Sequence, residues 1–276
     1  MSTNQLTTDR LTAEDPLVRS RGEGVADAGS PAAAVRVSGV SQVFERGRPP
    51  VLDGVDLTVA PGEFVCLVGA SGCGKSTLLN LLAGLVKPTA GQVEVSAQRP
   101  ALMFQEPALL PWLTASGNVE LALRARGVGR VERRAEAARL LGVVNLADAG
   151  RKRVHELSGG MRQRVALARA LAQDSSVLLM DEPFAALDAI TRDVLHLELA
   201  RVWAEQQLSV VFVTHNVREA VRLGQRVVLM GSRPGRIVRE WRVDLPQPRT
   251  IESAGVSELA AEITRELHRE ISRHGN

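Results

Sequence analysis

The chain has 276 residues, a formal net charge of +3 and a hydrophobic fraction of 45%, so its length allows one or two domains and its composition supplies an ample core. Aromatic residues make up only 3% of the chain, tyrosine is absent and no long basic run occurs, which argues against a surface for nucleic acid. No apolar stretch is long enough to span a membrane, and the two cysteines predict a reducing cytosol rather than a disulfide framework.

The first part of the chain is predicted to be a tail followed by β-strands. Residues 1–34 are rich in Ser, Thr, Ala, Gly and Asp and have little apolar periodicity, which is typical of a disordered segment. Apolar residues recur through 35–43 and 55–59, and an apolar run fills 63–68, so these three segments are predicted strands. Two more strands are expected at 92–95 and 101–104.

A glycine-rich segment follows the strand predicted at 63–68. Residues 69–76 read Gly-Ala-Ser-Gly-Cys-Gly-Lys-Ser and fit G-x-x-x-x-G-K-[ST], a loop whose backbone N–H groups hold nucleotide phosphates. Lys75 would reach the β- and γ-phosphates and Ser76 would bind Mg²⁺. A chance glycine-rich turn is the alternative, and the strand and helix predicted on either side disfavour it. The nucleotide-binding residues predicted here are Gly69, Ser71, Gly72, Cys73, Gly74, Lys75, Ser76 and Thr77.

Cys73 stands at a variable position of this loop, where a small filler residue is the simplest interpretation. A thiol near a helix N-terminus and beside Lys75 is nevertheless expected to favour its thiolate form. A maleimide should then label Cys73 and block ATP hydrolysis, and bound nucleotide should protect the thiol.

The middle of the chain, from about residue 107 to 160, has apolar spacings that predict a helical subdomain without strands. Beyond it, buried strands predicted at 177–180 and 209–213 alternate with helices. Further strands are expected at 227–230 and 237–238. The alternation predicts a parallel sheet with functional sites at the carboxyl ends of its strands.

The segment 246–276 carries Leu259, Ile263, Leu267 and Ile271, each four residues after the last. This spacing predicts an amphipathic C-terminal helix. We expect its apolar face to pack on the rest of the chain rather than on a membrane surface.

Two carboxylates, Asp181 and Glu182, follow the strand predicted at 177–180. Asp181 can hold Mg²⁺ through a water molecule, and Glu182 can polarise the water that attacks a phosphoryl group. The alternative is that the pair only begins a helix, where carboxylates suit the helix dipole. The phosphate loop upstream favours the catalytic interpretation.

Further motifs resemble those of the ATP-binding subunit of an ABC transporter, and they occur in the family's order. Residues 157–163 match the signature motif, 177–183 the second nucleotide motif, 186–188 the D-loop and 214–215 the switch histidine, and Gln105 matches the Q-loop. The resemblance implies an α/β fold for residues 35–245: a P-loop NTPase (ABC ATPase) core with a mixed sheet, an N-terminal antiparallel β part and an inserted helical subdomain.

The same resemblance implies roles for single residues. Ser158, Gly159 and Gly160 would contact ATP held by a second copy, so that a homodimer completes two sites. Asp188 would line the dimer seam, His215 would contact the γ-phosphate and Gln105 would sense Mg²⁺. Where the family usually stacks a tyrosine on adenine, this chain offers Phe44, which could equally be a core strand residue.

Residues 110–112, 181–192 and 245–249 resemble the nitrate/sulfonate/taurine importer group. This resemblance implies an ATPase on the cytoplasmic face of the membrane that couples ATP hydrolysis to uptake of a small anionic solute. Aliphatic sulfonate is favoured, with nitrate and taurine as alternatives. The implied partners are transmembrane permease subunits, contacted near 107–119, and indirectly a periplasmic or lipoprotein solute-binding protein.

Other ATPase classes are less favoured. A DNA-repair ATPase of the family would place a long coiled coil between Lys75 and Ser158, and no heptad run occurs there. A translation factor would carry two cassettes, and a GTPase would carry an Asn-Lys-x-Asp motif, which this chain lacks. An exporter subunit stays open as an alternative.

Overall fold

The computed structural model describes residues 33–45, 47–247, 249–250 and 253–274. The tail predicted at 1–34 lies outside the described residues except for its last two. Within the described ranges, none of the helices combines the length and apolar character needed to traverse a bilayer.

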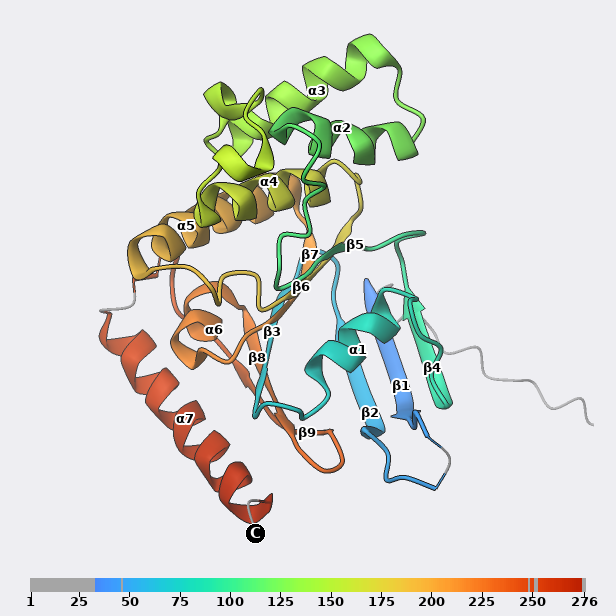
Figure 1. Ribbon diagram of the computed structural model, residues 1–276. Coiled ribbons are helices and arrows are strands. Elements are labelled where there is room, and N and C mark those ends of the chain that lie inside the picture. The colour runs from blue at the N-terminus through green and yellow to red at the C-terminus, as the bar shows by residue number, and fades with distance from the viewer. Residues whose placement is uncertain (1–32, 46, 248, 251–252, 275–276) are drawn as a thin grey trace, which may run out of the picture. The chain divides into compact units, whose positions relative to one another are not determined.

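A three-stranded antiparallel sheet begins the described chain (Figure 1). Strand β1 (Val35–Gln42) lies between β2 (Leu52–Val59) and β4 (Ala90–Val95). Its buried valines and those of β2 form one core cluster with the apolar side of helix α1 (Lys75–Leu82). Within these two strands, the apolar residues that predicted them are therefore the ones that face the core.

The second sheet has six strands in the order β5-β6-β7-β3-β8-β9, and only β9 is antiparallel to its neighbour. The central strands are continuous apolar runs because both faces of this sheet are covered. Its strands are β3 (Phe64–Gly69), β5 (Ala101–Met103), β6 (Val177–Asp181), β7 (Ser209–Val213), β8 (Arg226–Gly231) and β9 (Arg236–Arg242). The predicted mixed α/β fold with an antiparallel N-terminal part is confirmed.

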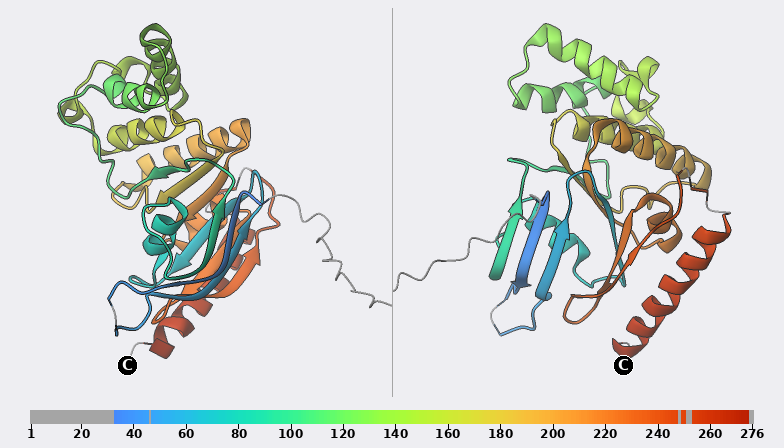
Figure 2. Two further views of the ribbon diagram at one scale, coloured as in Figure 1. Left: turned by 90° about the vertical axis from the view of Figure 1, so that its right-hand side faces the viewer. Right: turned by 180° about the vertical axis from the view of Figure 1, so that it is seen from behind.

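Between β5 and β6 the described residues form helices and a single isolated β-bridge, which joins Thr114 to Arg153. Helices α2 and α3 pack on each other and on α4, and Figures 1 and 2 show this helical layer above the six-stranded sheet. The elements of this part are α2 (Ala115–Ala125), α3 (Arg130–Val143), the 3₁₀ turns Ala147–Ala149 and Val154–Glu156, and α4 (Gly159–Leu171).

Three helices accompany the later strands: α5 (Ala189–Gln206), α6 (Val217–Leu223) and α7 (Ala254–His274). Helix α7 packs on α6 and β8 through buried residues that include Val256 and Ile263. Of the four residues that predicted its apolar face, Ile271 departs from the expectation because it is 42% exposed near the end of the helix, beyond the main contact.

Candidate functional site

The segment 70–74 connects β3 to α1 as the sequence motif requires. Gly72 and Gly74 have φ angles of +77° and +98°, a region that strains any residue with a side chain. A Cβ atom at Gly74 would lie 2.5 Å from Leu52 Cδ2, and one at Gly69 would lie 2.6 Å from the Met230 carbonyl oxygen. The glycines therefore let the loop turn tightly against the strands beneath it.

Lys75, the first residue of α1, places its ammonium group inside this loop. Its side chain is buried, and Nζ donates to the carbonyl oxygens of Gly69 at 2.9 Å and Ala70 at 3.0 Å. Ser71 and Gly72 are exposed at the rim of the loop. A phosphate that reaches the rim would therefore meet backbone N–H groups, a helix N-terminus and a cation together.

Asp181, the last residue of β6, is half-buried near the Ser76 hydroxyl at the start of α1. Burial raises the pKa of the Asp181 carboxyl, the nearby Ser76 hydroxyl counteracts this rise, and the charge of Glu182 adds to it. The described residues contain no cluster of three or more His, Cys, Asp and Glu side chains that could hold a metal. A serine hydroxyl and one carboxylate fit Mg²⁺, which takes few protein ligands and completes its shell with phosphate oxygens and water.

Glu182 and His215 meet at the ends of adjacent parallel strands. Glu182 follows β6 with a φ of +43°, and its N–H donates to the Val213 carbonyl oxygen at 3.0 Å. Its Oε2 lies 2.9 Å from Nδ1 of His215, whose side chain is 64% exposed. The structure thus brings together the two residues predicted to be catalytic.

The signature residues lie at the beginning of α4. Ser158 caps this helix by accepting a hydrogen bond from the Met161 N–H at 3.2 Å, and Ser158 and Gly159 are both exposed. A Cβ at Gly160 would lie 2.3 Å from Thr191 Cγ2, which explains the glycine there. In Figure 1, α4 lies with the upper helices, whereas the loop after β3 lies at the lower end of that strand.

The remaining predicted residues occupy loops and helix ends. Asp188 caps α5 by accepting from the Thr191 N–H at 2.9 Å, and this bond lowers the pKa of its carboxyl. Gln105 is exposed just after β5. Phe44 is 60% exposed, which excludes the core-strand alternative and leaves its ring accessible to a base.

The expectation of a thiolate at Cys73 is wrong. Its side chain is only 1% exposed, and burial raises the pKa of the thiol more than the charge of Lys75 lowers it. The tight turn points Cys73 beneath the loop, where Lys75 Nζ lies 3.7 Å from its sulfur. The thiol therefore stays protonated near neutral pH and is shielded from reagents.

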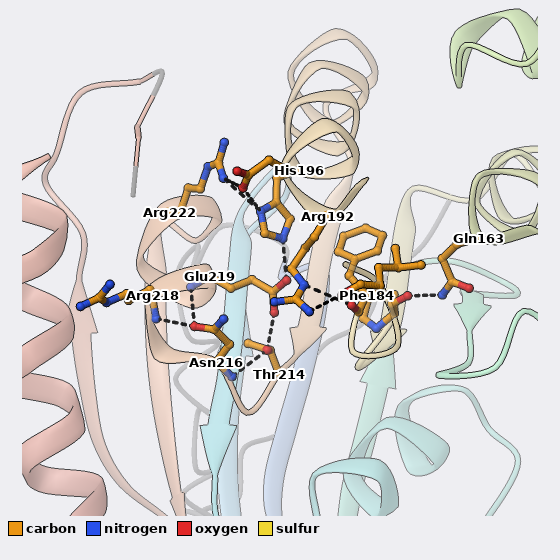
Figure 3. Close-up of polar contacts among 12 residues, drawn as sticks. Gln163, Phe184, Arg192, His196, Thr214, Asn216, Arg218, Glu219 and Arg222 are labelled. Atoms are coloured by element: carbon orange, nitrogen blue, oxygen red, sulfur yellow. Dashed lines mark hydrogen bonds and ion pairs between the residues drawn. The ribbon is translucent and has the colours of Figure 1, made fainter. Parts of the chain in front are cut away.

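Two buried polar arrangements around this site were not predicted. The Gln163 amide of α4 donates to the Pro183 carbonyl, next to Glu182. A second set, drawn in Figure 3, joins His196, Glu219 and Thr214. The sequence carries no clear signal for the second set, because Glu219 lies in α6 between two other charged residues, Arg218 and Arg222.

Comparison with known proteins supports a nucleotide-binding site at this position. A family model described as ABC transporter matches residues 52–185. The chain is 49% identical over 218 residues to the taurine import ATP-binding protein TauB of Chromobacterium violaceum, a match that covers 76% of this chain and 83% of that protein.

The chain belongs to the ABC transporter ATP-binding proteins. The nitrate import ATP-binding protein NrtD of Synechocystis is 45% identical over 221 residues, which cover 77% of this chain and 83% of that protein. The predicted assignment to the nitrate/sulfonate/taurine importer group is thereby confirmed.

Two solved structures of ABC transporter cassettes resemble the fold of this chain. The dimeric structure of MJ0796, a bacterial ABC transporter cassette, has a TM-score of 0.69 and 32% identity and covers 77% of this chain and all of that chain. The dimeric structure of MJ0796 in a post-hydrolysis state, bound to ADP and Pi, has a TM-score of 0.68 and 33% identity with the same coverage. The chain is an ATP hydrolase of the ABC importer type.

Proposed function

We propose that two copies of the chain bind Mg·ATP at their shared face and hydrolyse it with the residues assembled at the ends of β3, β6 and β7. The observation that supports this most directly is the 2.9 Å contact between Glu182 and His215. In this proposal Glu182 orients and polarises the attacking water, and His215 holds Glu182 while contacting the γ-phosphate.

Other residues bind and neutralise the phosphates. The Lys75 ammonium exchanges its two carbonyl partners for the β- and γ-phosphate oxygens. Asp181, Ser76 and Gln105 would hold Mg²⁺, which neutralises charge on the transferred phosphoryl group. Ser76 is the second residue of α1 and Asp181 ends β6, and the Ser76 hydroxyl is near enough to lower the pKa of the Asp181 carboxyl, so two of these groups already lie near each other.

The second copy supplies the remaining contacts. Ser158 and Gly159 are exposed at the N-terminus of α4, where they can reach phosphates across a two-fold axis. The dimeric structures of MJ0796 support this arrangement. Asp188 would line the seam, and loss of the γ-phosphate would let the copies separate.

We further propose that the ATPase drives import of a small anionic solute, with aliphatic sulfonate as the preferred class. The names of the relatives, which include taurine and nitrate importers, support a small solute with an anionic group, since nitrate is an anion and taurine carries a sulfonate. Permease subunits at the cytoplasmic face of the membrane would bind near residues 107–119, where Trp112 is 67% exposed. A periplasmic or lipoprotein solute-binding protein would deliver the solute.

The solute can be tested in proteoliposomes that contain this chain, its permease and its solute-binding protein. We expect alkanesulfonates, added with the binding protein, to stimulate ATP turnover at least severalfold over the solute-free rate. Stimulation by nitrate alone would overturn the sulfonate assignment. Transport that needs only the permease would favour an exporter.

The exposed ring of Phe44 leads to a separate expectation about the base. Because base–aromatic stacking typically contributes about 1–3 kcal/mol, Phe44→Ala should raise the Kd for ATP about tenfold, and Phe44→Tyr should keep it near the original value. Equilibrium binding of ATP and of inorganic triphosphate separates an effect on the base from an effect on the phosphates. Equal weakening for both ligands would remove Phe44 from the adenine site.

A further inference from the structure

Three side chains from three different elements meet in the interior beside the proposed catalytic pair. Thr214 follows β7, Glu219 lies in α6 and His196 lies in α5, and their exposed fractions are 2%, 5% and 1%. Figure 3 shows them converging on the Glu219 carboxylate. His196 Nε2 lies 2.5 Å from Glu219 Oε1, and the Thr214 hydroxyl donates to Glu219 Oε2.

The direction of each hydrogen bond follows from the partners. Arg222, which can only donate, places its Nη1 3.3 Å from His196 Nδ1, so Nδ1 accepts and Nε2–H donates to Glu219. Both oxygens of Glu219 are therefore used, and Arg222 also pairs with Asp193 at 2.5 Å. A buried carboxylate without such partners would be costly, so the arrangement is specific.

The hydrogen bonds around Glu219 hold Thr214 and Asn216, the residues on either side of His215. The Thr214 hydroxyl accepts a hydrogen bond from the Asn216 N–H at 2.9 Å while it donates to Glu219. The Asn216 side chain in turn accepts from the N–H groups of Arg218 and Glu219 at the start of α6. His215 itself is exposed, and its side-chain contact is with Glu182. The buried carboxylate thus fixes the backbone that carries an otherwise exposed ring.

The other end of the set contacts the segment that follows Glu182. The His196 ring lies 5.5 Å from the Phe184 ring, measured between centroids, in an edge-on arrangement. Arg192, also in α5, donates to the carbonyl oxygens of Phe184 at 3.3 Å and Leu187 at 2.6 Å. Helix α5 therefore contacts both the Glu219 carboxylate and the 184–188 segment.

We propose that Glu219, together with Thr214 and His196, is a positioning residue that sets the placement of His215 relative to Glu182 during ATP hydrolysis. This inference rests on the proposed function of those two residues. If Thr214, Glu219 and His196 only stabilised the fold, they would not control the position of the His215 ring. The two cases differ in how turnover and the His215 resonance respond to loss of the Thr214 hydroxyl.

The test uses Thr214→Val, which keeps the shape of the side chain and removes its hydroxyl. Loss of a hydrogen bond to a charged group should lower kcat about tenfold, with the KM for ATP unchanged and the protein still folded at the assay temperature. Thr214→Ser should restore turnover. Arg218→Ala is the matched control, because Arg218 is exposed and uses only its backbone N–H here.

A second readout follows the ring of His215 itself, whose resonance can be assigned among five histidines by His215→Gln. In protein labelled with ¹³C at histidine Cε1, we expect Thr214→Val to shift that resonance and Arg218→Ala to leave it in place. Should Thr214→Val fail to fold, His196→Phe, which keeps a ring against Phe184 and removes the N–H donor, should give the same two changes.

Unchanged kcat in the folded variant, or a fall in kcat without movement of the His215 resonance, would overturn the positioning role. Wild-type turnover in His215→Gln would instead overturn the proposed function of His215. The two failures are therefore distinguishable.

Discussion

Replacing Glu182 with Gln is expected to lower ATP turnover about 1,000-fold, because general-base catalysis typically contributes 10²–10⁴-fold. The amide keeps the size of the side chain and a hydrogen bond to His215 but cannot take a proton from water. Lys75, Ser76 and Asp181 are untouched, so the Kd for ATP should stay near its original value. Steady-state phosphate release and equilibrium nucleotide binding measure the two quantities.

The same variant should accumulate as an ATP-bound dimer, because hydrolysis is the step proposed to separate the copies. Size-exclusion chromatography with Mg·ATP should show the variant as a dimer. The unmodified protein should form the dimer only transiently, because it hydrolyses the ATP. Glu94→Gln is a matched control, since Glu94 is an exposed carboxylate on β4 with only a 4.0 Å contact to Arg36. Near-normal turnover of Glu182→Gln would remove Glu182 from the catalytic role.

Ser158→Arg is expected to lower hydrolysis at least about 100-fold while leaving ATP binding to the single chain intact. The arginine would occupy the exposed N-terminus of α4, where the second copy must approach. Isothermal titration with ATP and phosphate release separate binding from hydrolysis.

The substitution also removes the hydroxyl that caps α4, which costs about 1 kcal/mol of folding free energy. Thr114→Arg controls for this loss, because Thr114 caps α2 in the same way by accepting from the Gly117 N–H at 3.0 Å. We expect the isolated Thr114→Arg protein to hydrolyse ATP normally. Equal losses in both variants would indicate a stability effect rather than a blocked contact.

Much of the fold could be predicted because its signals are local. The apolar run that ends at Gly69 and the glycines that follow specify a strand and a tight turn over a few residues. Helix α5 likewise carries Leu195, Leu199 and Val202 at helical spacing, and all three are fully buried. The order of the strands was not predictable in the same way, since neighbours in this sheet come from distant parts of the chain.

The error at Cys73 and the failure to predict the His196–Glu219 pair share one cause, which is burial by residues far away in the sequence. The neighbours of Cys73 along the chain predicted a thiolate, but its thiol lies beneath the loop, and the turn between β8 and β9 brings Gly235 against the Cys73 carbonyl. His196 and Glu219 are 23 residues apart in two different helices, and only the folded chain brings their side chains together as a buried pair.

The claim that each ATP site is shared between two copies is tested most directly by mixing two inactive variants. Lys75→Ala should fail to hold the phosphates, and Ser158→Arg should fail to close over them. In a mixed dimer one site contains both substituted residues, and the other site contains the unchanged Lys75 of one copy and the unchanged Ser158 of the other. Equal amounts should therefore recover roughly a quarter of the original turnover, if the sites act independently. A mixture no more active than the two proteins measured separately would contradict the shared site.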